Sequence, residues 1–331
     1  MKAIILKEYG RNSSFLPAEI PEPKLENDKV IIQVCASSVN PVDCKIRNGL
    51  LPGVAPNLPG VLHGDVSGIV REVGDEVKDF KVGDEVYGCI GGFSHMPGVL
   101  SEYALADSRL IAKKPVRLSM IEAAALPLVS ITAWNALVDR GRISPNQKVL
   151  IHAGTGGVGH LALQLAKAMG AETHVSISNV KKAEIARALG ADDILHYSRE
   201  KPGQFLQNLP QGCLYDLVLD TVGGCCLDQS FQAAREYGTV VSIAARASHD
   251  LTLMHMKSLS LHVVFMLLPL LQNQHREKHG QILQEIAAFV DQGKIYPLIH
   301  PEVFSFENVG KAHQCWESSQ AIGKIVLENN W

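Results

Sequence analysis

Three glycines at positions 154, 156 and 159 have the spacing of a turn that holds phosphate groups. They follow the apolar segment KVLIH and precede an alanine- and leucine-rich segment, so the turn joins a predicted strand to a predicted helix. In such a turn the first glycine permits a tight bend, the second lets the backbone approach a pyrophosphate, and the third allows close packing of helix on strand. Amides at the helix start then face the phosphates, where the helix dipole favours negative charge. The sequence therefore predicts a dinucleotide site made of Gly154, Thr155, Gly156, Gly157, Val158 and Gly159.

The residues after the next predicted strand indicate which dinucleotide binds. An NAD site usually has a carboxylate there, about 20 residues beyond the glycines, to accept the ribose hydroxyls. This chain instead has Ser178 and Asn179, followed by Lys181 and Lys182. Hydroxyls and cations suit a ribose phosphate, so the sequence favours NADPH over NADH. The alternative is that both lysines are solvated residues in the first turn of the next helix.

The elements that must position this turn alternate along the second half of the chain. Strand-like and helix-like segments follow one another from KVLIH to GTVVSIA, with helices expected at 181–189 and between the strands DDILHY and YDLVLD. Such alternation specifies a parallel sheet with helices on both faces. Residues 1 to about 117 instead carry short β-like segments separated by Gly, Pro and Asp, which predicts a compact, mainly β domain. The predicted fold class is α/β, a doubly wound parallel sheet plus a mainly β domain.

Composition narrows the class of function. The 331 residues carry a net charge of -3 and no long basic cluster, so a nucleic-acid partner is not expected. The apolar stretch LHVVFMLLPLL, from Leu261, is too short to cross a bilayer, and we expect it in the core or at an interface. The first ten residues do not read as a secretory signal, and the seven cysteines include no C-x-x-C pair. We therefore expect a cytoplasmic protein with reduced thiols and a small-molecule partner.

Several motifs together resemble the medium-chain dehydrogenase/reductase superfamily. They are the glycine turn, NPVDCKIRNG at 40–49, GDVSGIVREVG at 64–74, FKVGDEVYG at 80–88 and GKIVL at 323–327. Nearly the whole chain is covered, and it is most similar to the zinc-independent quinone oxidoreductase branch, which includes zeta-crystallin. The resemblance implies a GroES-like catalytic domain at 1–123, a Rossmann NADPH-binding domain at 124–268, and a return segment at 269–331 that completes the catalytic domain. It also implies a homodimer.

Zinc-dependent alcohol dehydrogenases of this superfamily hold a catalytic zinc with two Cys and one His. Here Asn40 stands at the position of the first Cys, and Gly64, with its acidic neighbour Asp65, stands at the position of the His. The position of the second Cys falls near Leu128. An amide, a glycine and a leucine cannot replace thiolate and imidazole ligands, so we expect no metal. Without a Lewis acid an alkoxide is not stabilised, which disfavours alcohol oxidation. An improvised site from Cys44, His63 and Asp65 is the alternative.

The resemblance further implies individual cofactor residues. Ser178, Lys182 and Tyr197 would flank the ribose phosphate, and Asn40 and Asp43 match a motif beside the nicotinamide. The other expected cofactor residues are Val222 in the strand end LDTVGG, Ala244 and Lys324. Many relatives carry a Tyr shortly after the RNG segment, whereas this chain has Leu50 and Leu51, which predicts a more apolar substrate pocket.

The implied activity is NADPH-dependent hydride transfer to a quinone or to an α,β-unsaturated carbonyl. Negative charge would build on the substrate oxygen, and polar donors must stabilise it. The catalytic candidates are Asn40, Asp43, Tyr87 and Thr132. Asn40 has a second interpretation, because it can cap a short helix that has Pro41 at its first position and ends at Gly49.

Two other functions stay open. One is an NADPH-binding structural or regulatory protein without turnover, in the manner of lens crystallins. The other is reduction of enoyl thioesters, which would need a basic approach to a coenzyme A phosphate; the segment REKH at 276–279 lies in the right late region.

Overall fold

The computed structural model of the protein describes residues 1–197, 214–319 and 321–331. These residues form two compact units. Unit 1 comprises Met1–Leu128, Leu267–Gln292 and Pro297–Trp331, and unit 2 comprises Val129–Met266 and Gly293–Tyr296. The domain limits expected at residues 123 and 268 stay predictions, and the helix expected between DDILHY and YDLVLD lies outside the described residues.

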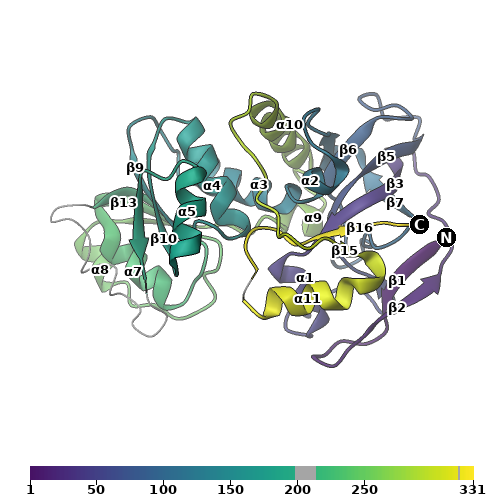
Figure 1. Ribbon diagram of the computed structural model, residues 1–331, viewed down its shortest axis with the longest axis horizontal. Coiled ribbons are helices and arrows are strands. Elements are labelled where there is room, and N and C mark those ends of the chain that lie inside the picture. Colours follow the sequence, from purple (N-terminus) through teal and green to yellow (C-terminus); the bar gives the residue numbers. More distant parts are fainter. Residues whose placement is uncertain (198–213, 320) are drawn as a thin grey trace. The chain divides into compact units, whose positions relative to one another are not determined.

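Unit 2 is built on a parallel sheet with the strand order β11-β10-β9-β12-β13-β14 (Figure 1). Its strands are β9 (Lys148–His152), β10 (Glu172–Ile177), β11 (Asp193–His196), β12 (Tyr215–Asp220), β13 (Ala234–Ser242) and β14 (Ser260–Val263). In the part of unit 2 that the structure describes, the helices that follow these strands are α4 (Gly157–Ala168), α5 (Val180–Ala188), α7 (Cys225–Ala233) and α8 (Thr252–Met256). The apolar run at 149–151 is fully buried, as expected for a strand covered on both faces. The predicted parallel sheet and the alternation of strands and helices are confirmed.

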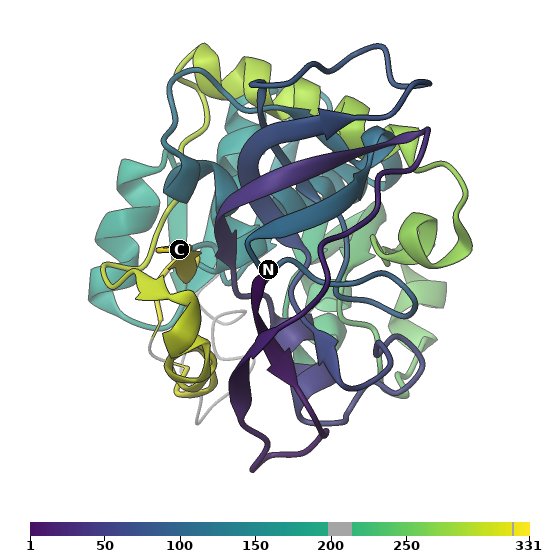
Figure 2. The ribbon, with the colours of Figure 1, turned by 90° about the vertical axis from the view of Figure 1, so that its right-hand side faces the viewer.

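Unit 1 is mainly β and contains two sheets (Figure 2). The smaller sheet pairs β2 (Phe15–Glu19), β1 (Lys2–Leu6) and β4 (Gly60–Val61). The larger sheet contains β15 (Phe304–Ser305), β16 (Val326–Glu328), β3 (Lys29–Ser38), β5 (Asp65–Val73), β6 (Glu85–Cys89), β8 (Ile111–Lys113) and β7 (Tyr103–Asp107). Its helical segments are α1 (Pro41–Arg47), η1 (Ser108–Leu110), α2 (Met120–Ala124), α9 (Leu268–Gln272), α10 (Glu277–Asp291), η3 (Phe306–Asn308) and α11 (Val309–Glu317). Helix α3 (Pro127–Trp134) and the π-helix η2 (Asn135–Arg140) carry the chain from unit 1 into unit 2.

A buried ion pair fastens the start of α10 to the larger sheet of unit 1. The Arg276 Nη1 donates to Asp107 Oδ2 over 2.9 Å, and both side chains are less than a tenth exposed. Burial raises the pKa of Asp107, but hydrogen bonds from Arg109 and Arg276 outweigh it and hold that pKa below its ordinary value. Removing Asp107 would leave the buried guanidinium of Arg276 without its carboxylate, whereas removing Arg276 would leave Asp107 paired with Arg109 alone. The pair therefore holds the start of α10 against the sheet.

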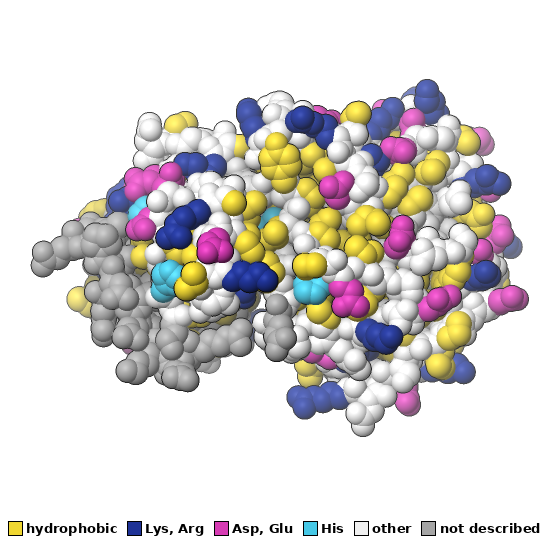
Figure 3. Space-filling view, viewed as in Figure 1, with side chains coloured by type: hydrophobic (Ala, Val, Ile, Leu, Met, Phe, Trp, Pro, Cys, Tyr) yellow, Lys and Arg dark blue, Asp and Glu magenta, His cyan; other side chains and the backbone are white. Residues whose placement is uncertain are grey.

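The charged side chains on the surface are mixed in sign, as the small net charge of the sequence indicates (Figure 3). On the face shown in Figure 3, Lys and Arg side chains are interspersed with Asp and Glu. Within the described residues, no helix is both long enough and apolar enough to cross a bilayer.

Two buried histidines pair in the core of unit 1. His63 lies just before β5 and His313 lies on α11, and their Nε2 atoms are 2.8 Å apart, so one ring donates to the other. The ring of Phe15 packs edge-on against His313, with centroids 5.0 Å apart. Burial lowers the pKa of His63 from 6.5 to about 3 and lowers that of His313 well below 6.5. Both rings are therefore neutral in the folded protein at neutral pH.

These histidines make the free energy of unfolding depend on pH. Because their folded pKa values are depressed, the unfolded chain binds more protons below about pH 6.5, so each neutral histidine lowers stability by about 1.4 kcal/mol per pH unit as pH falls. We expect His313→Phe to make the slope of stability against pH shallower by roughly that amount between about pH 6 and about pH 4.5. Urea unfolding at several pH values measures the slope. His275→Asn is the control, since His275 is 70% exposed; an equal change there would contradict the assignment.

Candidate functional site

The order of strands in unit 2 defines where a dinucleotide can bind. The chain order reverses between β9 and β12, because β10 and β11 lie on one side of β9 while β12, β13 and β14 lie on the other. Ligands of open parallel sheets bind at the carboxyl ends of the strands at such a reversal. Here Thr221 Oγ1 donates to the carbonyl oxygen of His152 over 2.7 Å and ties the carboxyl ends of β12 and β9 together. The predicted glycine turn leaves β9 at this point.

The glycine turn is constrained by close packing. A Cβ on Gly154 would lie 2.5 Å from the Cβ of Val175 on β10, and one on Gly159 would lie 2.2 Å from the carbonyl oxygen of Ala153. The left-handed residue of the turn is Ala153, with φ 52°, rather than a glycine. Gly154 is therefore required by its contact with the neighbouring strand, and its own φ is not positive.

The start of α4 is suited to an anion. Gly156 is the N-cap of the helix, with φ -79° and ψ 178°, and it has no side chain to accept from the first amides. The first turn of any helix has amides without acceptors inside the helix. In α4 the first helical turn contains Gly157, Val158 and Gly159. An oxygen of a bound phosphate can therefore take the place of a capping side chain there. Thr155, in the same turn, is only 3% exposed.

The residues predicted for the ribose phosphate gather at the carboxyl ends of β10 and β11. Ser178 follows β10 directly, and Asn179 caps α5 by accepting from the Lys182 amide over 2.9 Å. Tyr197 follows β11, and its amide donates to the carbonyl oxygen of Ile177 over 3.0 Å. The structure therefore brings Ser178, Lys182 and Tyr197 to one edge of the sheet.

Asp220, at the end of β12, organises the rest of this edge and was missed in the sequence. It is fully buried; its Oδ1 accepts from the amides of Val222 and Gly223, both over 2.9 Å, and its Oδ2 accepts from Ser242 Oγ over 2.7 Å. The same Ser242 oxygen accepts from the amide of Ala244 over 3.2 Å. Val222 and Ala244 are thus held by one carboxylate and one hydroxyl. An Asp that ends an apolar strand is the signal in the sequence, but it is equally typical of an ordinary turn.

In unit 1, the predicted residue Asn40 stands at the centre of a buried polar cluster. Its Nδ2 donates to Asp65 Oδ2 over 2.7 Å, and its Oδ1 accepts from Lys324 Nζ over 2.6 Å. The Asn40 backbone amide donates to Asp43 Oδ2 over 2.7 Å. Asn40 precedes α1, with Pro41 at the first position and Gly49, with φ 73°, just beyond the end. The expected helix is confirmed, and the side chain of Asn40 is directed to the cluster.

The two carboxylates of this cluster differ in how they are satisfied. Asp65 Oδ2 accepts from Ser38 Oγ over 2.9 Å as well as from Asn40, and its Oδ1 accepts from the amide of Leu128 over 2.8 Å. Asp43 Oδ1 has no hydrogen-bond partner among the described residues. Burial raises the pKa of Asp43 to about 7, the bond from the Asn40 amide opposes the rise, and the charge of Asp65 adds to it.

Lys324 lies in unit 1 within this cluster. Its side chain is 3% exposed, and its ammonium donates to the Val39 carbonyl oxygen over 3.0 Å as well as to Asn40, with Asp65 Oδ2 3.4 Å away. Burial lowers the pKa of Lys324, and the charges of Asp65 and Asp43 oppose this. The sequence placed Lys324 with the cofactor residues and gave no sign of these partners.

Tyr87 and Thr132 are the two remaining catalytic candidates. Tyr87 is fully buried on β6, and its hydroxyl donates to the carbonyl oxygen of Leu283 on α10 over 2.5 Å. Burial raises the pKa of Tyr87 far above its ordinary value. Thr132 is buried on α3 and belongs to unit 2, whereas Asn40 belongs to unit 1. Since the single hydroxyl proton of Tyr87 is already donated within the core, we leave this residue out of the proposed donor set.

The donor types at the expected zinc positions do not fit the metal. An amide in a network with an ammonium, a glycine and a leucine occupy those positions, and His63 of the alternative site faces His313. Among the described residues, no three His, Cys, Asp or Glu side chains are grouped so that they could hold a metal ion.

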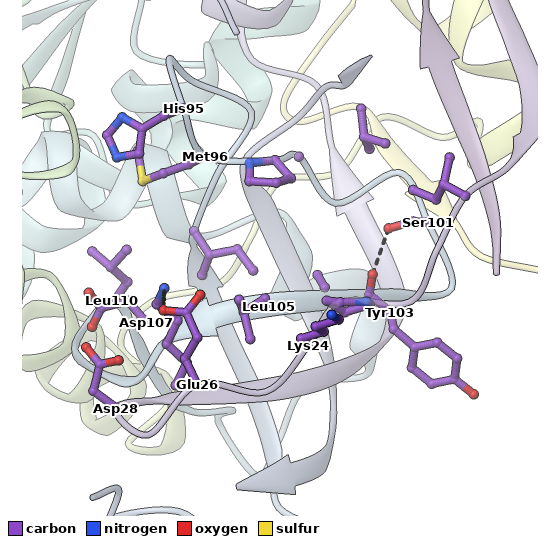
Figure 4. A pocket seen from close by; sticks show the side chains of 18 of the residues that line it. Lys24, Glu26, Asp28, His95, Met96, Ser101, Tyr103, Leu105, Asp107 and Leu110 are labelled. Atoms are coloured by element: carbon purple, nitrogen blue, oxygen red, sulfur yellow. Dashed lines mark hydrogen bonds and ion pairs between the residues drawn. The ribbon is translucent and has the colours of Figure 1, made fainter. Parts of the chain in front are cut away.

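A separate hollow of about 710 Å³ opens on unit 1. Figure 4 shows Glu26, Asp28 and Asp107 at one end of it and Ser101 and Tyr103 at the other. None of the residues predicted for catalysis or for cofactor binding lines this hollow.

The chain matches two family models and many known proteins. Residues 26–116 match the alcohol dehydrogenase GroES-like domain, and residues 189–327 match a zinc-binding dehydrogenase model. It is 32% identical to the NADPH-dependent alkenal/one oxidoreductase, chloroplastic, of Arabidopsis thaliana, over 99% of this chain and 79% of that protein.

Two solved structures are similar along their whole length. An alcohol dehydrogenase superfamily protein from Novosphingobium aromaticivorans has a TM-score of 0.93 and 36% identity, and covers 99% of both chains. The quinone oxidoreductase from Coxiella burnetii has a TM-score of 0.84 and 31% identity, again over 99% of both. The GroES-like and Rossmann fold class expected from the sequence is thereby confirmed. The chain belongs to the medium-chain dehydrogenase/reductase superfamily, and its similarity to quinone and alkenal oxidoreductases is consistent with the zeta-crystallin-like branch.

Proposed function

We propose that this protein is an NADPH-dependent reductase of quinones or of α,β-unsaturated carbonyl compounds. The observation that carries the proposal is the glycine turn at the strand-order reversal, with Ser178 and Lys182 where an NAD enzyme would have a carboxylate. The names of the Arabidopsis and Coxiella relatives support the same chemistry.

The residues of unit 2 fit NADPH. The absent side chain at Gly156 leaves room for a pyrophosphate near the backbone, and the start of α4 offers amides to it. Gly154 and Gly159 instead let the turn pack closely against β10 and against the backbone of Ala153. Ser178, Lys182 and Tyr197 would hold the ribose phosphate, while Val222 and Ala244 would border the cofactor. When bound, NADPH supplies a hydride, and the protein has to place the cofactor and exclude water around it.

The polar cluster of unit 1 supplies what the substrate oxygen needs. A reduced quinone or enone carries negative charge on oxygen, and a fixed amide donor stabilises that charge better than mobile water does. We propose Asn40 as this donor and Thr132 as a further candidate. Asp43, another predicted catalytic residue, accepts from the backbone amide of Asn40 and would hold Asn40 in place. No step uses a metal, because the residues at the expected zinc positions are of the wrong type.

The test of this function is a panel of substrates, with turnover measured as the loss of NADPH absorbance. We expect turnover with simple quinones, enals or enones and less with enoyl thioesters. Preference for enoyl thioesters would favour the thioester reductase alternative. Tight NADPH binding without turnover of any of them would favour a structural or regulatory role and would overturn the reductase proposal.

Lys182 tests the choice of cofactor. A charge-assisted hydrogen bond to phosphate contributes about 1.5 to 3 kcal/mol, so Lys182→Ala should weaken NADPH binding by roughly tenfold or more while changing NADH binding less than about twofold. Titration of the intrinsic fluorescence with each nucleotide measures both constants. The matched control is Lys181→Ala, its exposed neighbour. Equal losses for NADPH and NADH would remove Lys182 from the phosphate site.

We also propose that the protein is a homodimer joined through β14. This strand is at the edge of the sheet of unit 2 as described, and the apolar side chains of Val263 and Phe265 are 53% and 43% exposed. An edge strand with exposed apolar side chains favours pairing with a second copy. The cytoplasmic location expected from the cysteines stays a prediction.

Light scattering after size-exclusion chromatography tests the dimer. We expect wild type at twice the single-chain mass of 35.9 kDa and Val263→Lys at that mass, because a charge on the edge opposes pairing. Val82→Lys replaces an apolar side chain of unit 1 that is 64% exposed and should leave the mass unchanged. A monomeric wild type at micromolar concentration would rule out the interface.

A further inference from the structure

The side-chain amide of Asn40 is held at both of its ends. Its nitrogen faces the carboxylate of Asp65 at 2.7 Å, and its oxygen faces the ammonium of Lys324 at 2.6 Å. The reverse orientation would place the amide oxygen against the carboxylate and the amide hydrogens against the ammonium. Both contacts would then be repulsive in a buried site, where electrostatic interactions are strong. One orientation of the amide is therefore strongly selected.

The ammonium of Lys324 is saturated by protein acceptors. An ammonium has three hydrogens, and the structure gives three acceptors: the Val39 carbonyl oxygen at 3.0 Å, Asn40 Oδ1 at 2.6 Å and Asp65 Oδ2 at 3.4 Å. The side chain is 3% exposed. The three acceptors can therefore take all three hydrogens of the ammonium within unit 1.

The nitrogen of Asn40 keeps a second hydrogen. An amide nitrogen has two hydrogens, and one of them is donated to Asp65. The direction of the second is fixed by the same two partners, because the amide group is planar. A donor whose direction is set before the substrate binds does not have to reorganise while charge builds on the substrate oxygen.

We propose that Lys324, together with Asp65, is a positioning residue that orients the Asn40 amide as a hydrogen-bond donor; the inference rests on the proposed function of this site. Lys324 acts through Asn40 and touches neither substrate nor cofactor. The ammonium also balances the charge of Asp65, and the experiment must separate this contribution to stability from the orientation of the amide.

A double-mutant cycle separates the contribution of Lys324 to stability from its effect on the orientation of the Asn40 amide. We expect Asn40→Ala to lower kcat about 100-fold and Lys324→Met to lower it at least about tenfold, with the Kd for NADPH changed less than about threefold in both. The double variant Asn40→Ala/Lys324→Met should be no slower than the worse single variant, since Lys324 has nothing left to orient. Additive losses, or a loss of NADPH affinity with kcat unchanged, would overturn the proposal.

Two further variants control for stability. Arg276→Met breaks the buried ion pair with Asp107 in the same unit, where both side chains are less than a tenth exposed, and should lower the Tm while kcat stays within about twofold. Lys324→Met/Asp65→Asn restores charge balance without a donor to Asn40 Oδ1, and its kcat should stay at least about tenfold low. Recovery of wild-type kcat in this variant would show that charge balance alone matters, against the proposal.

A readout without turnover distinguishes failure of the inference from failure of the proposed function. In protein labelled with [15N]asparagine, the side-chain amide hydrogens of Asn40 should exchange slowly in wild type and in Arg276→Met, and at least about tenfold faster in Lys324→Met. If wild type reduces no quinone, enal or enone, the proposed function fails while this measurement still decides the orientation. Equal exchange in all three proteins would overturn the positioning role of Lys324.

Discussion

The buried carboxylate of Asp65 is the interaction on which unit 1 depends. It accepts from Ser38 at the end of β3, from Asn40 before α1 and from the amide of Leu128 in the first turn of α3, and it lies 3.4 Å from the ammonium of Lys324. A carboxylate taken out of water costs several kcal/mol unless its oxygens are satisfied. Ser38 and Asn40 are neighbours in the sequence, but Leu128 and Lys324 are distant from them, so this requirement brings three separate segments to one point. The polar cluster is thus a structural junction as well as the candidate site.

Unit 2 depends on a different constraint, the absence of side chains. The glycine turn, β10 and α4 approach so closely that a Cβ at Gly154 or Gly159 would lie 2.5 Å or less from its neighbour. Close approach leaves the amides of the first turn of α4 at the carboxyl edge of the sheet, where the helix dipole favours a phosphate. At the neighbouring strand, the carboxylate of Asp220 accepts from two backbone amides and so fixes the turn that follows β12. The same close packing therefore positions the backbone amides that we propose bind the phosphate.

Two lysines show how burial decides the role of a charge. Lys182 lies in the first turn of α5 at the edge of the sheet, where a cation can meet a ribose phosphate. Lys324 is buried among acceptors that use all of its hydrogens, so it acts inside the protein. The sequence assigned both residues to the cofactor, since a lysine in a motif carries no sign of its depth. The two lysines are distinguished by how exposed each side chain is and by how many acceptors surround its ammonium.

Local patterns determined much of this protein. The spacing of Gly154, Gly156 and Gly159 after an apolar strand predicted the dinucleotide turn, and the alternation of segments predicted the parallel sheet, because both depend on neighbours in the chain. The tertiary structure alone decided which polar groups meet: Asn40 with Lys324, 284 residues away, and His63 with His313, 250 residues away. It also decided that the Tyr87 hydroxyl is used within the core. No periodicity records such contacts, because they arise only when distant segments pack and their buried donors and acceptors must find partners.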